Sequence, residues 1–473
     1  MPSQLDRPNF VFINTDQQRY DSLGCYGSEV ARTPNIDRLA AEGVRFERCY
    51  TAHPVCMPAR ATWFTGQYPS HHGVWQNGVP LSKRADTLQR RLGQAGYHAA
   101  LIGKIHLDNI WQRREKHPSY GFDLLIECEG DPYCFDDYFR WLDEQGLFEP
   151  YMEQFKQEGH RRGYVRDLPE EKHMNNWITG HVEEYLERRA AEERPFFLSV
   201  GFFDPHHPFD PCDPYASMFD AEDMPMPVFS EEEKQGMVPP AREKRSGDES
   251  FCTDTSPDAI RGTIAAYHAT ISHVDVMVGR IMDALRERGL AENTVVVYTS
   301  DHGELLGDHG MLHKGAFFYE CSVRVPLIFR FPDRCGAGGV EEGLVSHVDF
   351  APTVAALAGA EGPKLVQGSA LFDGDLEPRG EGERDFVMVE WRDRKVESEE
   401  PYETARCLIG ERYKYVHYHR QPYGELYDLR EDPDELVNLW DSPHHREVRE
   451  RMQRALWEHL VDSEPCPRRE DLF

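Results

Sequence analysis

The chain has 473 residues, of which 40% are hydrophobic, so it is long enough for two to three domains or for one large α/β domain with an appendage. Its formal net charge of −30 disfavours nucleic acid and anionic membrane surfaces as general partners. Its apolar runs all fall short of the roughly 18 residues that span a bilayer.

The cysteines and the N-terminus bear on the compartment. Eleven cysteines are scattered without a repeating spacing or a CxxC motif, which argues against a disulfide framework and a zinc knuckle. Residues 1–8 lack a basic start and an apolar core, so we expect no signal peptide. A reducing, cytoplasmic location is therefore the expectation.

Short apolar strands alternate with helices along the first three quarters of the chain. Residues 9–14 are apolar without alternation, which is typical of a strand buried on both faces of a parallel sheet. The same reasoning predicts strands at 97–102, 195–202, 294–299 and 325–329, and helices at 33–43, 60–65, 87–96, 173–193, 260–288 and 350–359. We therefore expect an α/β fold with a large, mostly parallel sheet sandwiched by helices.

The remaining segments are less regular. Residues 108–172 and the Pro-rich acidic stretch 208–257 are expected to be irregular insertions that face the substrate. After residue 365 the pattern changes to short, mostly antiparallel strands and a helix near 444–461. We expect a catalytic domain at 1–365 and a smaller α+β subdomain with an antiparallel sheet at 366–473, whose edge strands would allow a homo-oligomer.

Polar side chains follow four of the predicted strands, and in open α/β sheets ligands bind beyond such carboxyl ends. Asp16 and Gln17 follow the first strand, and a loop soon after the strand at 294–299 brings Lys314. The others that we expect at this edge are Lys104, His106, His206, Asp301 and His302. Chance would scatter such residues, so their concentration predicts an active site.

The chemistry of this set separates into two parts. Asp16, Asp301 and the side-chain carbonyl of Gln17 are oxygen ligands for a divalent cation such as Ca²⁺, Mg²⁺ or Mn²⁺, and His302 would complete the shell. The cationic and imidazole side chains suit an anionic tetrahedral group beside that metal: Lys104, His106, His206 and Lys314.

A further motif, Cys-x-Pro-x-Arg, places Cys56 and Arg60 near the start of a predicted helix. A cation and a helix N-terminus both favour a reactive thiol, although a buried cysteine beside a structural ion pair fits the motif alone equally well. The rest of the chain decides between these readings.

Together these motifs resemble a known family over nearly the whole length. They are Thr15-Asp16-Gln17, the segment 33–40, Cys56-Met57-Pro58-Ala59-Arg60, Gly103-Lys104-Ile105-His106, Asp204-Pro205-His206, Ser300-Asp301-His302-Gly303-Glu304 and, near the C-terminus, Arg412-Tyr413-Lys414-Tyr415 and Leu426-Tyr427-Asp428-Leu429. The chain resembles the type I sulfatases of the alkaline phosphatase superfamily.

This resemblance implies hydrolysis of sulfate esters by formylglycine, which a maturation enzyme makes from Cys56. The formylglycine hydrate would be the nucleophile, Arg60 would orient it, and the metal would be held by residue 56 with Asp16, Gln17, Asp301 and His302. Lys104, His106, His206 and Lys314 would bind the sulfate group or handle protons, with His206 as the acid for the leaving alkoxide. The implied partner is a small sulfated substrate.

Two residues depart from the commoner family pattern. Gln17 stands where many members have Asp, and His302 where they have Asn, so the implied Ca²⁺ has Mn²⁺ or Mg²⁺ as alternatives. This pairing, with Asn77 as a substrate-binding residue, resembles the phosphonate monoester hydrolase branch, whereas Lys104 and His106 are of the sulfatase type. A phosphonate monoester or phosphodiester hydrolase is the first alternative. A non-catalytic binding protein with unmodified Cys56 is the second.

Overall fold

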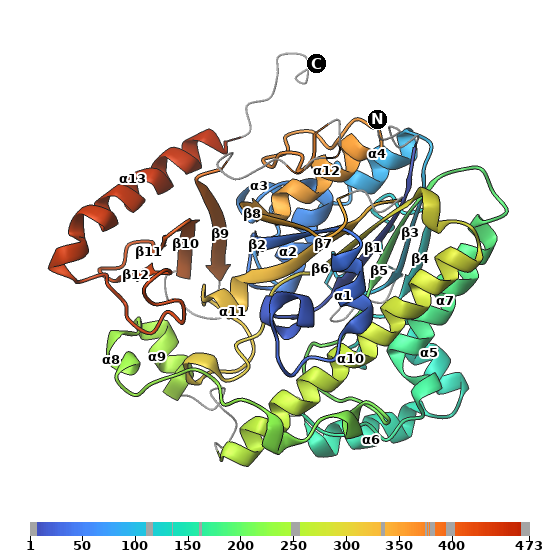
Figure 1. Ribbon diagram of the computed structural model, residues 1–473, viewed down its shortest axis with the longest axis horizontal. Coiled ribbons are helices and arrows are strands. Elements are labelled where there is room, and N and C mark those ends of the chain that lie inside the picture. Colours follow the sequence, from blue (N-terminus) through green and yellow to red (C-terminus); the bar gives the residue numbers. More distant parts are fainter. Residues whose placement is uncertain are drawn as a thin grey trace.

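An eight-stranded sheet forms the centre of the computed structural model (Figure 1), which describes residues 7–109, 117–134, 136–159, 163–246, 256–332, 336–373, 376, 378, 384–393 and 403–464. The strand order is β4-β3-β5-β1-β6-β7-β2-β8. Strand β7 runs antiparallel to both neighbours, and the other pairs are parallel. The bounds are β1 Asn9–Thr15, β2 Val44–Tyr50, β3 His98–Gly103, β4 Leu124–Glu127, β5 Phe196–Gly201, β6 Thr294–Ser300, β7 Arg324–Arg330 and β8 Gly339–Ser346. The predicted fold class is confirmed.

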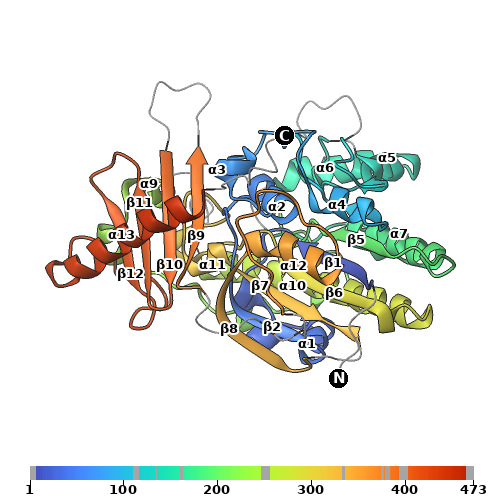
Figure 2. The same ribbon diagram turned by 90° about the horizontal axis from the view of Figure 1, so that it is seen from above.

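Helices cover both faces of this sheet (Figures 1 and 2). One face packs against α1 Pro34–Ala41, α5 Asp137–Glu144, α6 Phe148–Glu158, α7 Met174–Arg189 and α10 Pro257–Glu287. The other face packs against α2 Cys56–Thr65, α4 Leu88–Gln94 and α12 Phe350–Leu357. Shorter helices are α3 Pro69–His72, α8 Glu233–Gly236, α9 Pro239–Ser246 and α11 Glu320–Val323.

Strand β1 illustrates why its sequence lacks alternation. Val11 and Ile13 belong to the core under α7 and α10, whereas Phe10 and Phe12 belong to the core under α2 and α12. Successive side chains of a strand point to opposite faces, so a strand covered on both faces needs apolar residues at every position. All seven residues of β1 are buried.

A second sheet of four antiparallel strands follows, in the order β12-β11-β10-β9. Its strands are β9 Phe386–Asp393, β10 Glu403–Gly410, β11 Tyr413–Tyr418 and β12 Gly424–Asp428, and the helix α13 Arg446–Asp462 packs on it through Met452 and Leu456. The buried ammonium of Lys414 in β11 links this sheet to helix α11, because it lies 2.9 Å from Glu320, the first residue of α11, and it also lies 2.6 Å from Glu435.

The two expected irregular insertions contain more structure than predicted. Segment 108–172 includes β4, α5 and α6, and segment 208–257 includes α8 and α9, although 110–116, 135, 160–162 and 247–255 lie outside the described residues. The expectation of irregular structure was wrong there, because aromatic side chains of α5 and α6 pack into the hydrophobic core and stabilise these helices. Strand β8 was not predicted.

Two further observations concern the whole chain. The eight cysteines in the described segments are all unpaired, whereas Cys252, Cys335 and Cys466 lie outside them. In the described part of the chain, no helix combines the length and the apolar character that crossing a membrane requires.

Glu425 of β12 provides a prediction on pH and stability. Burial, followed by the charge of Glu435, raises the pKa of the Glu425 carboxyl to about 8. Because an unfolded Glu has a pKa of about 4.3, the folded protein retains a proton that the unfolded chain releases between these values, and this contribution to stability is lost as the pH rises. We expect Glu425→Gln to gain free energy of unfolding relative to the wild type, by at most about 1.4 kcal/mol per pH unit between about pH 5 and pH 8.

Urea unfolding across that pH range measures the effect, and the exposed Glu411 provides the matched control, Glu411→Gln. A difference between Glu425→Gln and wild type that does not change with pH contradicts the prediction.

Candidate active site

The predicted site residues lie at the carboxyl ends of neighbouring parallel strands. Thr15 of β1 is paired with Ser300 of β6, so Asp16 and Asp301, the next residues, leave the sheet side by side. Both carboxylates are fully buried. The parallel register therefore brings together two acids that are 285 positions apart in the sequence.

The next two strands meet closely at the same edge. Gly103 of β3 is paired with Gly201 of β5, and the Lys104 N–H donates to the Gly201 carbonyl at 2.8 Å. A Cβ at Gly103 would overlap that carbonyl oxygen, and Gly103 also has a φ of 106°. Glycine is therefore required for the approach that places Lys104 beside Asp16.

Cys56 is the first residue of α2, a helix whose ten residues are all buried. Pro58 in the first turn lacks an N–H, which removes one of the donors that a helix start leaves unpaired. The N–H of Met57, the residue before Pro58, donates to Asn77 Oδ1 at 3.0 Å. The exposed Asn77 thus caps the helix that carries Cys56.

The thiol of Cys56 lies at the centre of the site. Its Sγ is 3.5 Å from Asp16 Oδ1 and 3.2 Å from His302 Nε2, and Lys314 Nζ donates to it at 2.9 Å. Donor atoms of Asp16, Cys56, Asp301 and His302 all lie within 4.8 Å of one another, which is the arrangement of a metal site.

His302 and Gln17 each have an atom with a lone pair available for ligation. His302 Nδ1 lies 2.8 Å from the Gly303 carbonyl, which places the ring proton on Nδ1 and leaves the Nε2 lone pair facing Cys56. Gln17 Oε1 is buried and has no hydrogen-bond partner among the described residues. An orphaned amide oxygen costs free energy unless a cation or a donor binds it, so both residues fit a metal.

Arg60 joins the two carboxylates. Its Nε donates to Asp301 Oδ2 at 2.8 Å, and an Nη donates to Asp16 Oδ2 at 3.3 Å. Two more bonds of 3.1 Å run to Asn14 Oδ1 and the Lys104 carbonyl. Arg60 therefore fixes the positions of the site carboxylates rather than contacting Cys56.

Cations converge on Asp16. Its carboxylate lies 2.7 Å from Lys104 Nζ and 3.7 Å from Lys314 Nζ, and His206 Nε2 is 3.9 Å away. Burial opposes its ionisation, but the charges of Lys104 and Lys314, together with that of Arg60, outweigh burial and hold the pKa of Asp16 well below its usual value. This side of the site therefore attracts an anionic group.

The imidazoles at this edge are neutral. Burial, and then Lys314, lowers the pKa of His206 well below its usual value, and burial with Lys104 does the same for His106. His206 Nδ1 lies 2.6 Å from the His207 carbonyl, so its Nε2 presents a lone pair to the site. Burial and then Asp16 raise the pKa of the Cys56 thiol to about 11, so the unmodified thiol is a poor nucleophile at neutral pH.

The side chain of Gln17 is held by Glu304 and His207, and His313 in turn contacts Glu304. Its amide nitrogen donates to Glu304 and lies 3.1 Å from His207 Nδ1, while Glu304 accepts the backbone N–H of His313. Gln17 also has a φ of 65°, a left-handed conformation that the surroundings must stabilise. The strand-end pattern indicates Glu304, which follows His302 by two residues, and His313, which precedes Lys314, but it does not single out His207.

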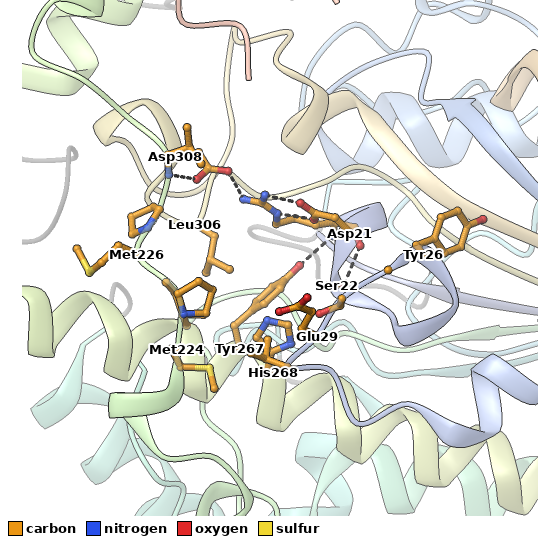
Figure 3. Close-up of a pocket in the computed structure, with 18 of the residues that line it drawn as sticks. Asp21, Ser22, Tyr26, Glu29, Met224, Met226, Tyr267, His268, Leu306 and Asp308 are labelled. Atoms are coloured by element: carbon orange, nitrogen blue, oxygen red, sulfur yellow. Dashed lines mark hydrogen bonds and ion pairs between the residues drawn. The ribbon is translucent and has the colours of Figure 1, made fainter. Parts of the chain in front are cut away.

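A separate cavity of about 550 Å³ has Asp21, Tyr267 and Asp308 in its lining (Figure 3). Tyr267 lines it and donates from its hydroxyl to the Gln17 carbonyl at 2.9 Å. Arg19 is the permanent cation in its lining, and Asp21 and Asp308, each at 2.7 Å, neutralise it. The cavity therefore lacks the positive charge that a sulfate group requires, and the cation-rich edge near Cys56 is the candidate site.

A mostly parallel α/β sheet with potential metal donors at its carboxyl edge, and a potential nucleophile at the start of a buried helix, is the arrangement of a hydrolase of the alkaline phosphatase superfamily. Residues 8–360 match the sulfatase family, and residues 307–462 match the family described as N-sulphoglucosamine sulphohydrolase, C-terminal. The chain belongs to the sulfatase family, and the prediction of a sulfuric ester hydrolase is confirmed.

Individual relatives span nearly the whole chain. It is 33% identical to the uncharacterized sulfatase YidJ of Escherichia coli, over 96% of this chain and 88% of that protein. It is 30% identical to an arylsulfatase of Clostridium perfringens, over 97% and 95% of the two chains. Among solved structures, the phosphonate monoester hydrolase of Agrobacterium radiobacter superposes with a TM-score of 0.83 and 29% identity, covering 97% of this chain and 96% of that one.

Proposed function

We propose that the enzyme hydrolyses small sulfate esters with a formylglycine made from Cys56. The observation that carries this proposal is the position of Cys56 Sγ, 3.2 Å from His302 Nε2 and 3.5 Å from Asp16 Oδ1. The sulfur stands where an oxygen of the modified residue would reach the metal. Once formed, the formylglycine hydrate would supply one hydroxyl that attacks sulfur and displaces the alkoxide, and a second whose deprotonation would expel sulfate and restore the aldehyde.

The metal in this proposal is held by Asp16, Gln17, Asp301, His302 and residue 56. Three side chains offer oxygen, and the free Oε1 of Gln17 supports its inclusion. Ca²⁺ is the first choice, and the imidazole of His302 keeps Mn²⁺ and Mg²⁺ as alternatives. When bound, the ion supplies positive charge that lowers the pKa of the nucleophilic hydroxyl.

The chain's own residues then act on the sulfate group. Lys104 and Lys314 are placed to neutralise the sulfate oxygens, because both ammonium groups already converge on Asp16. The anionic substrate favours uptake of a proton at His206 Nε2, and His206 passes this proton to the leaving alkoxide. His106 shares this edge, and Arg60 keeps Asp16 and Asp301 in position throughout.

A phosphonate monoester or phosphodiester hydrolase is the second candidate. It is favoured by the structural match to the phosphonate monoester hydrolase and by the Gln17 and His302 pair. In this reading Asn77, which caps α2 at Met57, would also contact the substrate with its amide. Both candidates use the same metal and the same modified residue.

The ratio of kcat/KM for an aryl sulfate and for an aryl phosphonate monoester separates the two candidates. We expect the sulfate ester to be preferred, because Lys104 and His106 are of the sulfatase type. A strong preference for the phosphonate would establish the second candidate instead.

Mass spectrometry of the peptide that contains residue 56 tests the modification directly. We expect the aldehyde after co-expression with a formylglycine-generating maturation enzyme, which is the proposed partner. A thiol alone under these conditions would contradict the mechanism and favour the binding-protein alternative. We further propose the division into residues 1–365 and 366–473, since the second sheet and α13 lie entirely in the latter part.

A further inference from the structure

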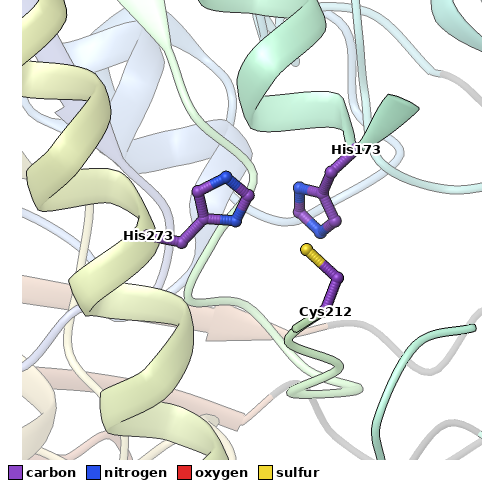
Figure 4. A group of neighbouring side chains, drawn as sticks. All are labelled: His173, Cys212 and His273. Atoms are coloured by element: carbon purple, nitrogen blue, oxygen red, sulfur yellow. The ribbon is translucent and has the colours of Figure 1, made fainter. Parts of the chain in front are cut away.

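A second cluster of metal-binding side chains lies between α7, the loop after β5, and α10 (Figure 4). His173 precedes α7 as its N-cap residue, Cys212 lies in the loop, and His273 belongs to α10. A nitrogen of each imidazole and the Cys212 Sγ lie within 4.8 Å of one another. All three residues are buried, and none belongs to the site around Cys56.

His273 has the protonation state of a metal ligand. Its Nε2 lies 2.6 Å from Asn176 Oδ1, which accepts the ring proton and fixes the tautomer. Its Nδ1 therefore carries a lone pair, is buried, and has no hydrogen-bond partner among the described residues. Figure 4 shows this nitrogen on the side of the ring that faces Cys212 and His173.

His173 contributes the second nitrogen. Its Nδ1 accepts a long hydrogen bond of 3.3 Å from the Asn175 N–H, and its other nitrogen lies beside Cys212 Sγ (Figure 4). Ligation through that nitrogen requires the ring proton to move to Nδ1, which breaks this long hydrogen bond from the Asn175 N–H.

Cys212 adds a soft sulfur donor to the two imidazole nitrogens. Its side chain is fully buried, so a metal ion bound there would be shielded from water.

We propose that His173, Cys212 and His273 bind one Zn²⁺ ion. A thiolate with two imidazoles is a donor set of zinc, and bonds of about 2.0 Å to nitrogen and about 2.3 Å to sulfur require only a small inward movement of the side chains. The ion joins α7 and α10 to the loop that also carries His206. It therefore stabilises one wall of the active site, and it is independent of the modification of Cys56.

The experiment uses Cys56→Ala protein, because this variant removes the other thiol that lies in a metal-donor set. The purified variant is analysed for zinc and is then exchanged with Co²⁺. We expect one zinc per chain and, after exchange, the sulfur-to-cobalt charge-transfer band that only a thiolate ligand produces. A folded parent protein that lacks both zinc and this band overturns the proposal without any further variant.

Variants in the same background assign the ligands. Cys212→Ser and His273→Gln are expected to lose the band and the tightly bound zinc. The matched controls are Cys128→Ser and His268→Gln, which alter a buried cysteine and a buried histidine of α10 outside the cluster, and both should retain them. A band that persists in Cys212→Ser would assign the thiolate elsewhere and overturn the proposal.

Discussion

Replacing Cys56 by Ala is expected to lower kcat/KM for an aryl sulfate by about 10⁴-fold or more, the range observed when a covalent nucleophile is removed. Without its thiol, residue 56 cannot be converted to the proposed aldehyde hydrate, while the cations around Asp16 remain. Substrate binding should therefore change less than turnover. Steady-state kinetics on protein with verified modification in the wild type measures the effect.

Cys407→Ala is the matched control, because Cys407 is also a fully buried thiol but lies in β10 of the second sheet. This variant should keep nearly wild-type kcat/KM, and the removal of its buried thiol should lower only the thermal stability. If Cys56→Ala retains more than about a tenth of the wild-type activity, residue 56 is not the nucleophile.

The convergence of the site could be predicted because it depends on one rule of topology. Parallel strands end at the same edge of a sheet, so recognising four strands is enough to place Asp16, Lys104, His206 and Asp301 together. The expected strands at 9–14 and 294–299 correspond to β1 and β6, which are hydrogen-bonded neighbours. This inference about the shared edge does not require the order of the strands in the sheet to be known.

Contacts made by single side chains from distant loops could not be predicted in this way. The support of Gln17 by Glu304 and His207 depends on how two loops fold over the strand ends, and no periodicity encodes that. The same holds for the proximity of Cys212 and His273, which no sequence pattern indicates. The tautomer of His273 depends on Asn176, a contact that appears only once α7 and α10 are packed.

Replacing Asp301 by Asn is expected to remove the divalent ion from the active site and to lower kcat/KM by about 10³-fold or more. Asp301 Oδ1 accepts the N–H groups of Gln17 and His302, at 3.0 and 2.9 Å, and Oδ2 accepts from Arg60. The amide nitrogen of Asn at this position must therefore face one of these two sets of donors. Metal analysis and kinetics on the same preparation measure the two effects. Retention of the ion together with near-native rates contradicts the assignment of Asp301 as a ligand.

Asp301→Asn also destabilises the fold, and this effect must be separated from the loss of metal. The substitution leaves the buried Arg60 with a weaker partner, and breaking a buried ion pair costs about 3–5 kcal/mol. Asp275→Asn provides the control for stability, because Asp275 is equally buried and accepts N–H groups at the start of α1, outside both metal-donor clusters. It should lower the thermal stability and keep both the metal and the activity.

The double variant Arg60→Gln with Asp301→Asn separates the two roles of Asp301. Asp301→Asn leaves Arg60 with Asp16 as its carboxylate partner, and removing both charges eliminates this weakly paired buried cation, so the melting temperature should recover relative to Asp301→Asn alone. If Asp301 acts mainly through its ion pair with Arg60, activity recovers along with stability. If it binds the metal, as we expect, the ion and the activity remain lost in a protein that is again stable, and the zinc proposed at His173, Cys212 and His273 remains bound.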